Sequence, residues 1–171
     1  MPQKATVTDK LTLEVVRQFR VVYGAMRHHF RLLEASCGIS GSQAWALQEI
    51  AHRPGVGISE LAACLGVHQS TCSLLVDKLA GRELLEKRRT VADQRRVGLH
   101  ISAAGRLLLQ RLPGPPEGLL PDALGKLPRQ TLQALRDSMN ALVRQLPAGN
   151  EAFSSTPLAE MLQESEEVNE P

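Results

Sequence analysis

Two short segments with helical periodicity stand on either side of Gly66, and they constrain the fold more than any other feature of the chain. The first runs from Glu60 to Leu65, with Ser59 as its expected cap. The second runs from about Gln69 to Gly81, and the apolar residues that repeat in it at helical spacing are Cys72, Leu75, Val76 and Leu79. Two short helices joined by a three- or four-residue turn that contains glycine predict a helix-turn-helix.

The sequence after this pair is typical of strands. Residues 84–89 can form one strand, and residues 96–101 alternate like its partner. The polar segment 90–95 would connect them as a hairpin. Segment 82–96 also carries six basic and three acidic residues, a net charge of +3. A hairpin directly after a helix-turn-helix predicts a winged helix, so the expected fold class is mainly α with a small β-hairpin wing.

Longer apolar stripes flank this module. One lies on a long amphipathic helix and consists of Val15, Phe19, Val22, Met26, Phe30 and Leu33. The other follows residue 128 and consists of Leu132, Leu135, Met139, Leu142 and Leu146, a narrow seam typical of a helix that packs on another helix. Ser40 with Gln43 predicts a capped helix, and Ser102 opens another, which the prolines of 113–116 interrupt.

Charge is distributed unevenly along the chain. The formal net charge is only +2, from 20 basic and 18 acidic residues. Residues 151–171 contain six acidic residues and no lysine or arginine, so residues 1–150 carry 20 basic and 12 acidic residues, a net charge of +8. A basic body with an acidic tail favours a polyanion as partner. The aromatic content of 3% argues against a stacking platform for single-stranded nucleic acid.

Other classes of protein are disfavoured. Three cysteines, at positions 37, 64 and 72, fit neither a disulfide framework nor a zinc spacing. No apolar run approaches the roughly 18 residues of a membrane helix, and the first ten residues lack a signal peptide's apolar segment, so we expect a cytoplasmic protein with no membrane partner. The sequence contains no nucleophile elbow, phosphate-binding glycine loop or metal motif, so we expect no enzymatic activity, cofactor or metal.

An ordered series of motifs resembles the MarR family of bacterial transcriptional regulators. The series comprises Ile58–Ala62, Ser70–Leu79, Leu84–Arg88, Asp93–Arg95 and Leu99–Gly105. Each motif alone is common, whereas their order and spacing together are quite specific. The resemblance covers roughly residues 11–147 and is strongest in the middle.

The resemblance implies a homodimer that binds double-stranded DNA and responds to an unidentified small-molecule effector. Residues 11–39 and 102–147 would form a helical dimerisation region, residues 40–101 a winged-helix DNA-binding lobe, and residues 148–171 an acidic, flexible tail. The expected function is that of a repressor that binds a pseudo-palindromic operator and is released by the effector. The two lobes would then lie about one turn of DNA apart, ~34–36 Å.

Two groups of residues are the candidate DNA contacts. The group on the recognition helix comprises His68, Gln69, Ser70, Thr71, Ser73 and Lys78, although Lys78 could equally be an ordinary exposed lysine. The group in the wing comprises Arg88, Arg89, Asp93, Arg95 and Arg96. By resemblance, Asp93 orients Arg95, whose side chain would enter the minor groove, while the other arginines would contact phosphates.

Two positions depart from the family pattern. His68 stands where relatives commonly have a serine cap, which leaves either a weaker cap or a ring that meets DNA. Leu74 stands where many relatives carry arginine, so DNA binding would depend more on Lys78 and on the wing.

Five residues are candidates for the effector pocket by resemblance, because they lie on helices that line it in the family: Tyr23, His28, His29, Cys37 and Trp45. The two histidines are adjacent, so their side chains point about 100° apart on a helix and do not easily share a metal. Cys72 is expected to be a buried small apolar residue.

Two alternative functions remain open. One is a redox-sensing regulator of the same fold, with the thiol of Cys37 as the sensor. The other is a winged-helix module that binds a protein through the same lobe.

Overall fold

The computed structural model describes residues 9–90, 93–147, 153–154 and 156–163, and for residues 90, 93–96 and 163 it describes the backbone only. Its elements are α1 (Lys10–Cys37), α2 (Gly41–His52), α3 (Ile58–Leu65), α4 (Gln69–Gly81), β1 (Leu85–Thr90), β2 (Asp93–Ile101), α5 (Ala103–Leu109), α6 (Leu119–Gly125), α7 (Arg129–Val143) and α8 (Leu158–Gln163). This part of the chain is mainly helical, with one two-stranded sheet, which confirms the predicted fold class.

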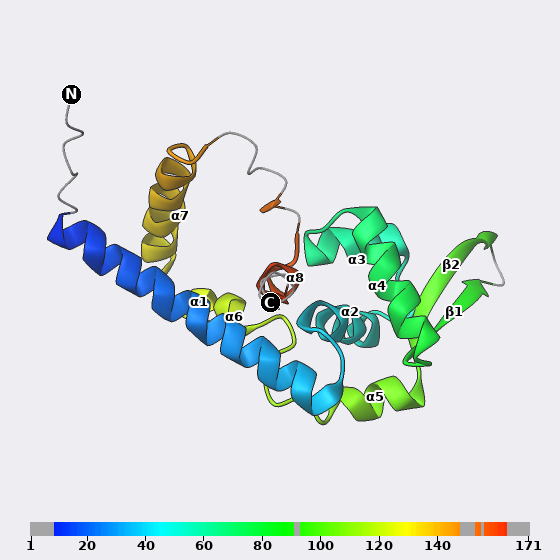
Figure 1. The fold of residues 1–171 in the computed structure, drawn as a ribbon. Helices are drawn as coiled ribbons and strands as arrows, with labels where there is room; N and C mark the ends of the chain where they lie inside the picture. The colour runs from blue at the N-terminus through cyan, green and yellow to red at the C-terminus, as the bar shows by residue number, and fades with distance from the viewer. Residues whose placement is uncertain (1–8, 91–92, 148–152, 155, 164–171) are drawn as a thin grey trace.

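The long helix α1 runs along one side of the molecule, and its N-terminal half extends beyond the lobe that holds the wing (Figure 1). It ends at Gly38, which has a φ of 65° and donates its N–H to the carbonyl of Glu34 at 2.7 Å. Helix α2 then begins with the predicted capping box, because the Ser40 hydroxyl accepts the Gln43 N–H at 3.3 Å and the Gln43 amide oxygen accepts the Ser40 N–H at 3.0 Å. The direction change between the two helices is therefore fixed by local bonds.

Helices α2, α3 and α4 enclose the apolar core of the lobe. The largest fully buried side chains are Leu33, Ile39, Leu47, Ile50, Leu61, Cys72, Val76, Leu79 and Leu99. The residues predicted to face inward from α4 are all buried, as the helical spacing indicated. Each buried leucine or isoleucine stabilises the fold by roughly 1.5–3 kcal/mol relative to an exposed one.

The start of α3 differs from the sequence-based expectation. Ser59 is not the cap, because α3 begins at Ile58, two residues earlier than expected, and Gly57 occupies the cap position. The N–H of Gly57 donates to the Glu60 carboxylate at 3.2 Å. The Ser59 hydroxyl lies within the first turn and donates instead to the side-chain carbonyl of Gln69 on α4, at 3.2 Å.

The wing is an antiparallel hairpin of β1 and β2, with Leu85 opposite Ile101 and Thr90 opposite Asp93. A register shift lies between Arg89 and Thr90. The predicted polar connection over 90–95 is therefore too long, since β2 already begins at Asp93. Residues 93–95 belong to β2 because the strand pairs with β1, although these residues do not show the apolar alternation that predicted the rest of the strand.

The base of the wing is joined to the lobe through residues 83–84 and 102–105. Ser102 caps α5 as predicted, because its hydroxyl accepts the Gly105 N–H at 3.0 Å. The same hydroxyl donates to the carbonyl of Glu83 at 2.7 Å, and the Ser102 N–H donates to that of Leu84 at 3.1 Å. Helix α5 thus begins against residues 83–84, which connect α4 to β1.

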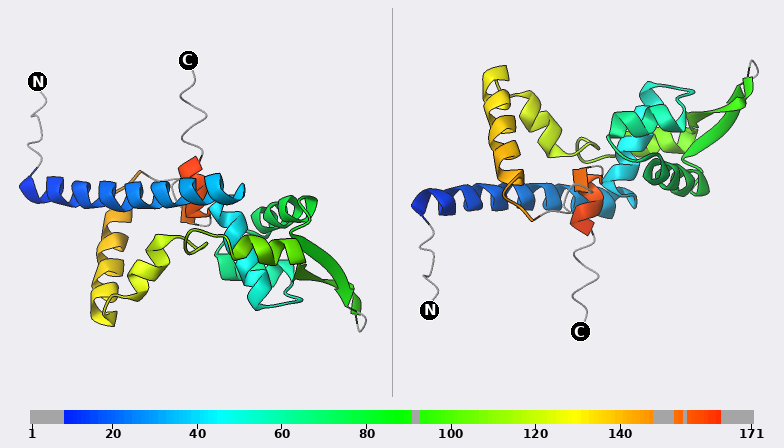
Figure 2. Two further views of the ribbon diagram at one scale, coloured as in Figure 1. Left: turned by 90° about the horizontal axis from the view of Figure 1, so that it is seen from below. Right: turned by 90° about the horizontal axis from the view of Figure 1, so that it is seen from above.

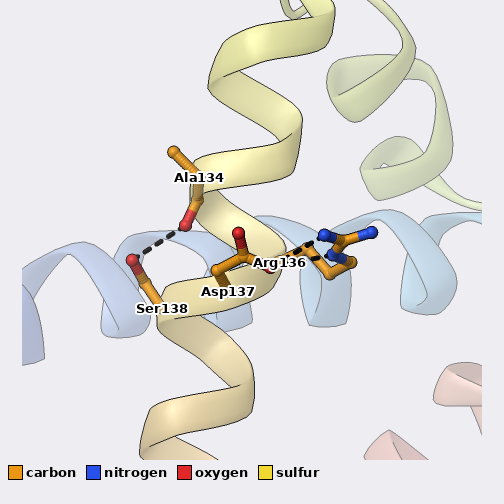
Figure 3. Close-up of polar contacts among 4 residues, drawn as sticks. All are labelled: Ala134, Arg136, Asp137 and Ser138. Atoms are coloured by element: carbon orange, nitrogen blue, oxygen red, sulfur yellow. Dashed lines mark hydrogen bonds and ion pairs between the residues drawn. The ribbon is translucent and has the colours of Figure 1, made fainter.

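The predicted break at 113–116 is confirmed, since α5 ends at Leu109 and α6 begins at Leu119. Helix α7 begins directly after residue 128, also as predicted. It projects from the side of α1 at the end of the molecule away from the wing (Figure 2). Its polar contacts are local: Arg136 bonds Asp137 at 2.9 and 3.0 Å, and the Ser138 hydroxyl donates to the Ala134 carbonyl at 2.8 Å (Figure 3).

The apolar stripes of α1 and α7 stay exposed in the single chain. The exposed members are Val15, Phe19 and Val22 on α1, and Leu132, Leu135, Met139, Leu142 and Leu146 on and just beyond α7. Exposed apolar stripes of this size are typical of protein-interaction surfaces. Within the described residues, no helix is both long and apolar enough to span a bilayer.

The segment that the sequence assigned to a flexible tail contains an ordered element. Helix α8 contacts α1 and α2, and its Ala159 and Leu162 form a small buried cluster with Phe30 of α1. For residues 158–163 the expectation of a flexible tail is therefore wrong. The apolar side chains at 159 and 162 give the physical reason, since they are three positions apart and share one helix face.

Candidate nucleic-acid interface

The recognition helix α4 presents its first turn to solvent. His68, Gln69 and Ser70 are exposed, while Thr71 and Ser73 are half-buried. The His68 side chain makes no capping hydrogen bond, so this cap is weaker than a serine cap, and contact of the ring with DNA stays a prediction. The first N–H groups of a helix have no partner within the helix, and they favour an anion such as phosphate at this position.

Contacts from neighbouring elements hold this surface in place. Gln69 receives the hydrogen bond from Ser59 of α3. At the other end, the Lys87 ammonium of β1 lies 2.6 Å from the Asp77 carboxylate of α4. An exposed ion pair of this kind contributes about 1 kcal/mol or less. The pair connects β1 to α4, which lie side by side (Figure 1).

The wing carries exposed basic side chains on β1. Arg88 bonds the Glu86 carboxylate at 2.8 Å, and Arg89 is exposed one position further along the strand. The predicted contacts Asp93, Arg95 and Arg96 have described backbone at the start of β2, but their side chains lie outside the described residues. The predicted wing contacts on both strands therefore fall in the half of the hairpin away from α5.

Leu74 is the most exposed apolar side chain of α4, with 63% of its surface accessible. It lies one turn after Ser70 and one turn before Lys78 on the exposed face. An apolar group at the centre of a polar helix face can contact the methyl group of thymine in the major groove. Leu74, which stands where many relatives carry arginine, therefore lies at the centre of the candidate DNA-binding surface.

A hollow of about 460 Å³ lies between α4 and the junction of α1 with α2. It is lined by Glu34, Gly38, Ser40, Gln43, Thr71, Leu74, Leu75, Lys78 and Glu160. Among these described residues Lys78 is the only basic one. Thr71 and Lys78 therefore border both this hollow and the exposed face of α4. Glu160 of α8 lines the same hollow, so an acidic side chain lies close to the candidate DNA-binding surface.

The five predicted pocket residues do not share one cavity in the single chain. Tyr23 and His28 are exposed on α1. His29 is buried, and its Nε2 lies 2.8 Å from the carbonyl of Pro115. Cys37 is buried beside the carbonyl of Arg111, at 3.8 Å, and Trp45 lines a separate cavity with α8. Their grouping as an effector pocket stays a prediction.

The cysteines differ in exposure. Cys64 is exposed, whereas Cys37 is 8% accessible and donates its thiol to a carbonyl. Cys72 is fully buried, as predicted, and burial raises the pKa of its thiol from 9.0 to about 11. Because thiol reactivity requires the thiolate and access, the buried thiols are poorly placed as sensors.

We expect a thiol reagent at pH 8 to label Cys64 of the native protein readily and Cys72 only after unfolding. The raised pKa also makes stability depend on pH, because the Cys72 thiol ionises at a lower pH in the unfolded chain than in the folded one. The contribution of Cys72 to the free energy of unfolding should therefore be complete below pH 9 and be lost as the pH rises towards 11. Mass spectrometry of labelled peptides and denaturation of wild type against Cys72→Ala check both points. Rapid native labelling of Cys72 would contradict its burial.

Comparisons with known proteins agree with this geometry. Residues 38–96 match the model of a family described as the MarR family. No curated protein sequence matches the chain significantly. Several solved structures have a similar fold. One is a MepR like protein complexed with pseudoligands, with 16% identity, a TM-score of 0.54, and coverage of 78% of this chain and 94% of that one.

Two further structures extend the comparison. The YusO protein from Bacillus subtilis has 15% identity and a TM-score of 0.52, with coverage of 82% of this chain and all of that one (100%). A MarR family transcription regulator has 18% identity and a TM-score of 0.52, with coverage of 80% of this chain and 90% of that one. At these identities the similarity establishes the fold, and most of the length of each solved chain is matched.

Proposed function

We propose that the protein, whose residues 38–96 match the MarR family model, is a dimeric transcriptional repressor that binds a pseudo-palindromic duplex operator and is released by a small-molecule effector. The observation that carries the proposal is the exposed first turn of α4 beside a hairpin with exposed arginines. In the proposed division, residues 40–101 bind DNA, and the helices on either side form the dimer.

The DNA-binding part of the proposal rests on shape and charge. A recognition helix enters the major groove by its N-terminal end, where Gln69 and Ser70 are exposed. A hairpin beside it reaches the neighbouring backbone or minor groove, where arginine is favoured. The net charge of +3 over residues 82–96 supplies attraction to phosphate that is independent of sequence.

The dimer is supported by the exposed stripes on α1 and α7. Both stripes lie away from the wing, so two copies can join there and keep both recognition helices accessible (Figure 2). Two lobes held about 34–36 Å apart match successive major grooves on one side of a duplex. An effector that alters this spacing would lower affinity for the operator without changing either lobe.

Replacement of Arg95 by alanine is expected to weaken duplex binding by about 1–3 kcal/mol, and to reduce the salt dependence of binding by about one unit of slope if the contact is to phosphate. Titration with a selected duplex at several salt concentrations measures both quantities. Lys126→Ala is the matched control, because Lys126 directly follows α6 and pairs with Asp122 at 2.6 Å. It should bind DNA like the wild type.

Size-exclusion chromatography should show an unchanged oligomer for the Arg95 variant. Unchanged affinity in that variant would show that the wing assignment is wrong. If the wild type binds no duplex even at low salt, the proposal as a whole fails.

A further inference from the structure

A cavity of about 140 Å³ lies where α1, α2 and α8 meet the segment between α5 and α6. It is lined by Phe30, Gly41, Ser42, Trp45, Pro116, Glu117, Pro121, Pro157, Leu158 and Ala159. Four parts of the chain thus meet there: the end of α1, the start of α2, the segment from 116 to 121, and the start of α8. A cavity of about 150 Å³ is large enough for a benzene-sized molecule.

Two buried oxygen atoms on residues that line this cavity have no hydrogen-bond partner among the described residues: the Ser42 hydroxyl and one carboxylate oxygen of Glu117. Ser42 is only 3% accessible. Leaving a buried polar atom unpaired costs about 1–3 kcal/mol, and more for a charged group. A native fold retains such atoms mainly where something else satisfies them.

The described lining has three polar side chains: the Glu117 carboxylate, which accepts hydrogen bonds, the Trp45 indole N–H, which donates, and the Ser42 hydroxyl, which can do both. It includes no lysine, arginine or histidine. Pro116, Pro121 and Pro157 have no backbone N–H to donate. A carboxylate oxygen can only accept a hydrogen bond, so it needs a donor from elsewhere. The single charged group of the described lining is therefore an acceptor, which disfavours an anion and favours a ligand that brings N–H groups and positive charge.

Aromatic side chains complete the site. Phe30 and Trp45 both line it, and a cation over an aromatic face is stabilised by the ring quadrupole. The Phe30 ring is closely held, because a Cβ at Gly41 would lie 2.3 Å from its Cδ1 and a Cβ at Gly118 would lie 2.8 Å from its Cζ. Glycine at both positions allows the ring to seat between the backbones, which defines one wall of the cavity.

An organic ammonium with an apolar body matches all three properties of the cavity: the unpaired oxygens, the aromatic wall and the apolar remainder.

We propose that this cavity binds a small organic cation, a protonated amine with an apolar or aromatic body, through Glu117, Ser42 and the rings of Phe30 and Trp45. The C-terminal segment closes the site, since Pro157, Leu158 and Ala159 form one side of it. The role of this site as the effector site rests on the proposed DNA-binding function. Binding of the cation does not, so it is tested on the protein without DNA.

The experiment compares three probes of similar shape: benzylammonium, benzyl alcohol and benzoate. Calorimetry on the full chain should show saturable binding of benzylammonium, binding of benzyl alcohol weaker by about tenfold or more, and no binding of benzoate, because the charge-assisted hydrogen bond is specific to the ammonium. Equal affinity for the ammonium and the alcohol, or no saturable binding of benzylammonium, would overturn the proposal.

Variants assign the binding to this cavity. Glu117→Gln should lose the preference for the ammonium over the alcohol, and Ser42→Ala should weaken both. Asp122→Asn is the matched control, since Asp122 is an exposed carboxylate on the neighbouring helix α6 that pairs with Lys126. It should bind as the wild type does.

The unfolding temperature without ligand shows whether Glu117 and Ser42 bind the ligand or stabilise the fold. Glu117→Gln and Ser42→Ala should unfold at the wild-type temperature or above it, because each removes or neutralises an unpaired buried group. Loss of folding in Glu117→Gln would show that the carboxylate supports the fold through a partner of its own and would refute the assignment. Displacement of duplex DNA by benzylammonium is measured afterwards and bears only on the effector role.

Discussion

Alanine in place of Gly105 is expected to lower the free energy of unfolding by about 3 kcal/mol, the upper end of the usual range for an over-packed site. A Cβ at this position would lie 2.2 Å from the carbonyl oxygen of Leu84 and 2.8 Å from Cγ1 of Ile101. The first neighbour is backbone, and it already accepts the N–H of Ser102. The chain can therefore make room only by moving the base of the wing away from α5.

Chemical denaturation measures the change in the free energy of unfolding. Gly81→Ala is the matched control, because it also adds one methyl group to a helical glycine but meets no atom within 4 Å. It should change stability by about 1 kcal/mol or less. A Gly105 variant as stable as the control would show that the wing base tolerates displacement, which would contradict the close packing described above.

Glutamate in place of Phe19 is expected to convert the protein to a monomer and to lower affinity for a two-site duplex by roughly a hundredfold or more, since the second lobe no longer binds as a linked partner. Phe19 lies in the exposed stripe of α1, with 42% of its surface accessible. In a dimer built on this stripe, the carboxylate would be buried without a partner, which costs several kcal/mol.

Light scattering after size exclusion and titration with one-site and two-site duplexes check this result. Arg17→Glu places the same side chain two residues away, about 200° around the helix and off the stripe, and should stay dimeric. Affinity for a single half-site should fall little in the Phe19 variant, because its lobe is intact. A Phe19 variant that remains dimeric would place the interface elsewhere.

Local signals in the sequence were sufficient to predict the lobe. Ser40 with Gln43, and Ser102 with Gly105, form their capping bonds between residues three positions apart, so both could be inferred without knowledge of the fold. The apolar face of α4 follows from spacing alone, and the family comparison over residues 38–96 supports the same lobe. The predicted DNA contacts on the wing remain predictions.

Other features depend on contacts between distant residues, which no local pattern encodes. Ser42 and Glu117 line one cavity although they are 75 positions apart in the chain, and neither was a candidate from the sequence. The docking of α8 was missed because acidic composition outweighed two apolar residues at helical spacing. Ser59 was predicted as the cap of α3, but the bond between the Gly57 N–H and the Glu60 carboxylate places the cap at Gly57 instead.

The cluster of Phe30 with Ala159 and Leu162 has a consequence for how the chain folds. The lobe is built from neighbours in sequence and can form early during synthesis, whereas Phe30 and Ala159 are 129 positions apart. The part of the Phe30 side chain that Ala159 and Leu162 bury therefore stays uncovered until residues 158–163 have left the ribosome. A nascent or prematurely terminated chain that ends before Pro157 would be the aggregation-prone species, since transiently exposed apolar surface is what drives misassembly.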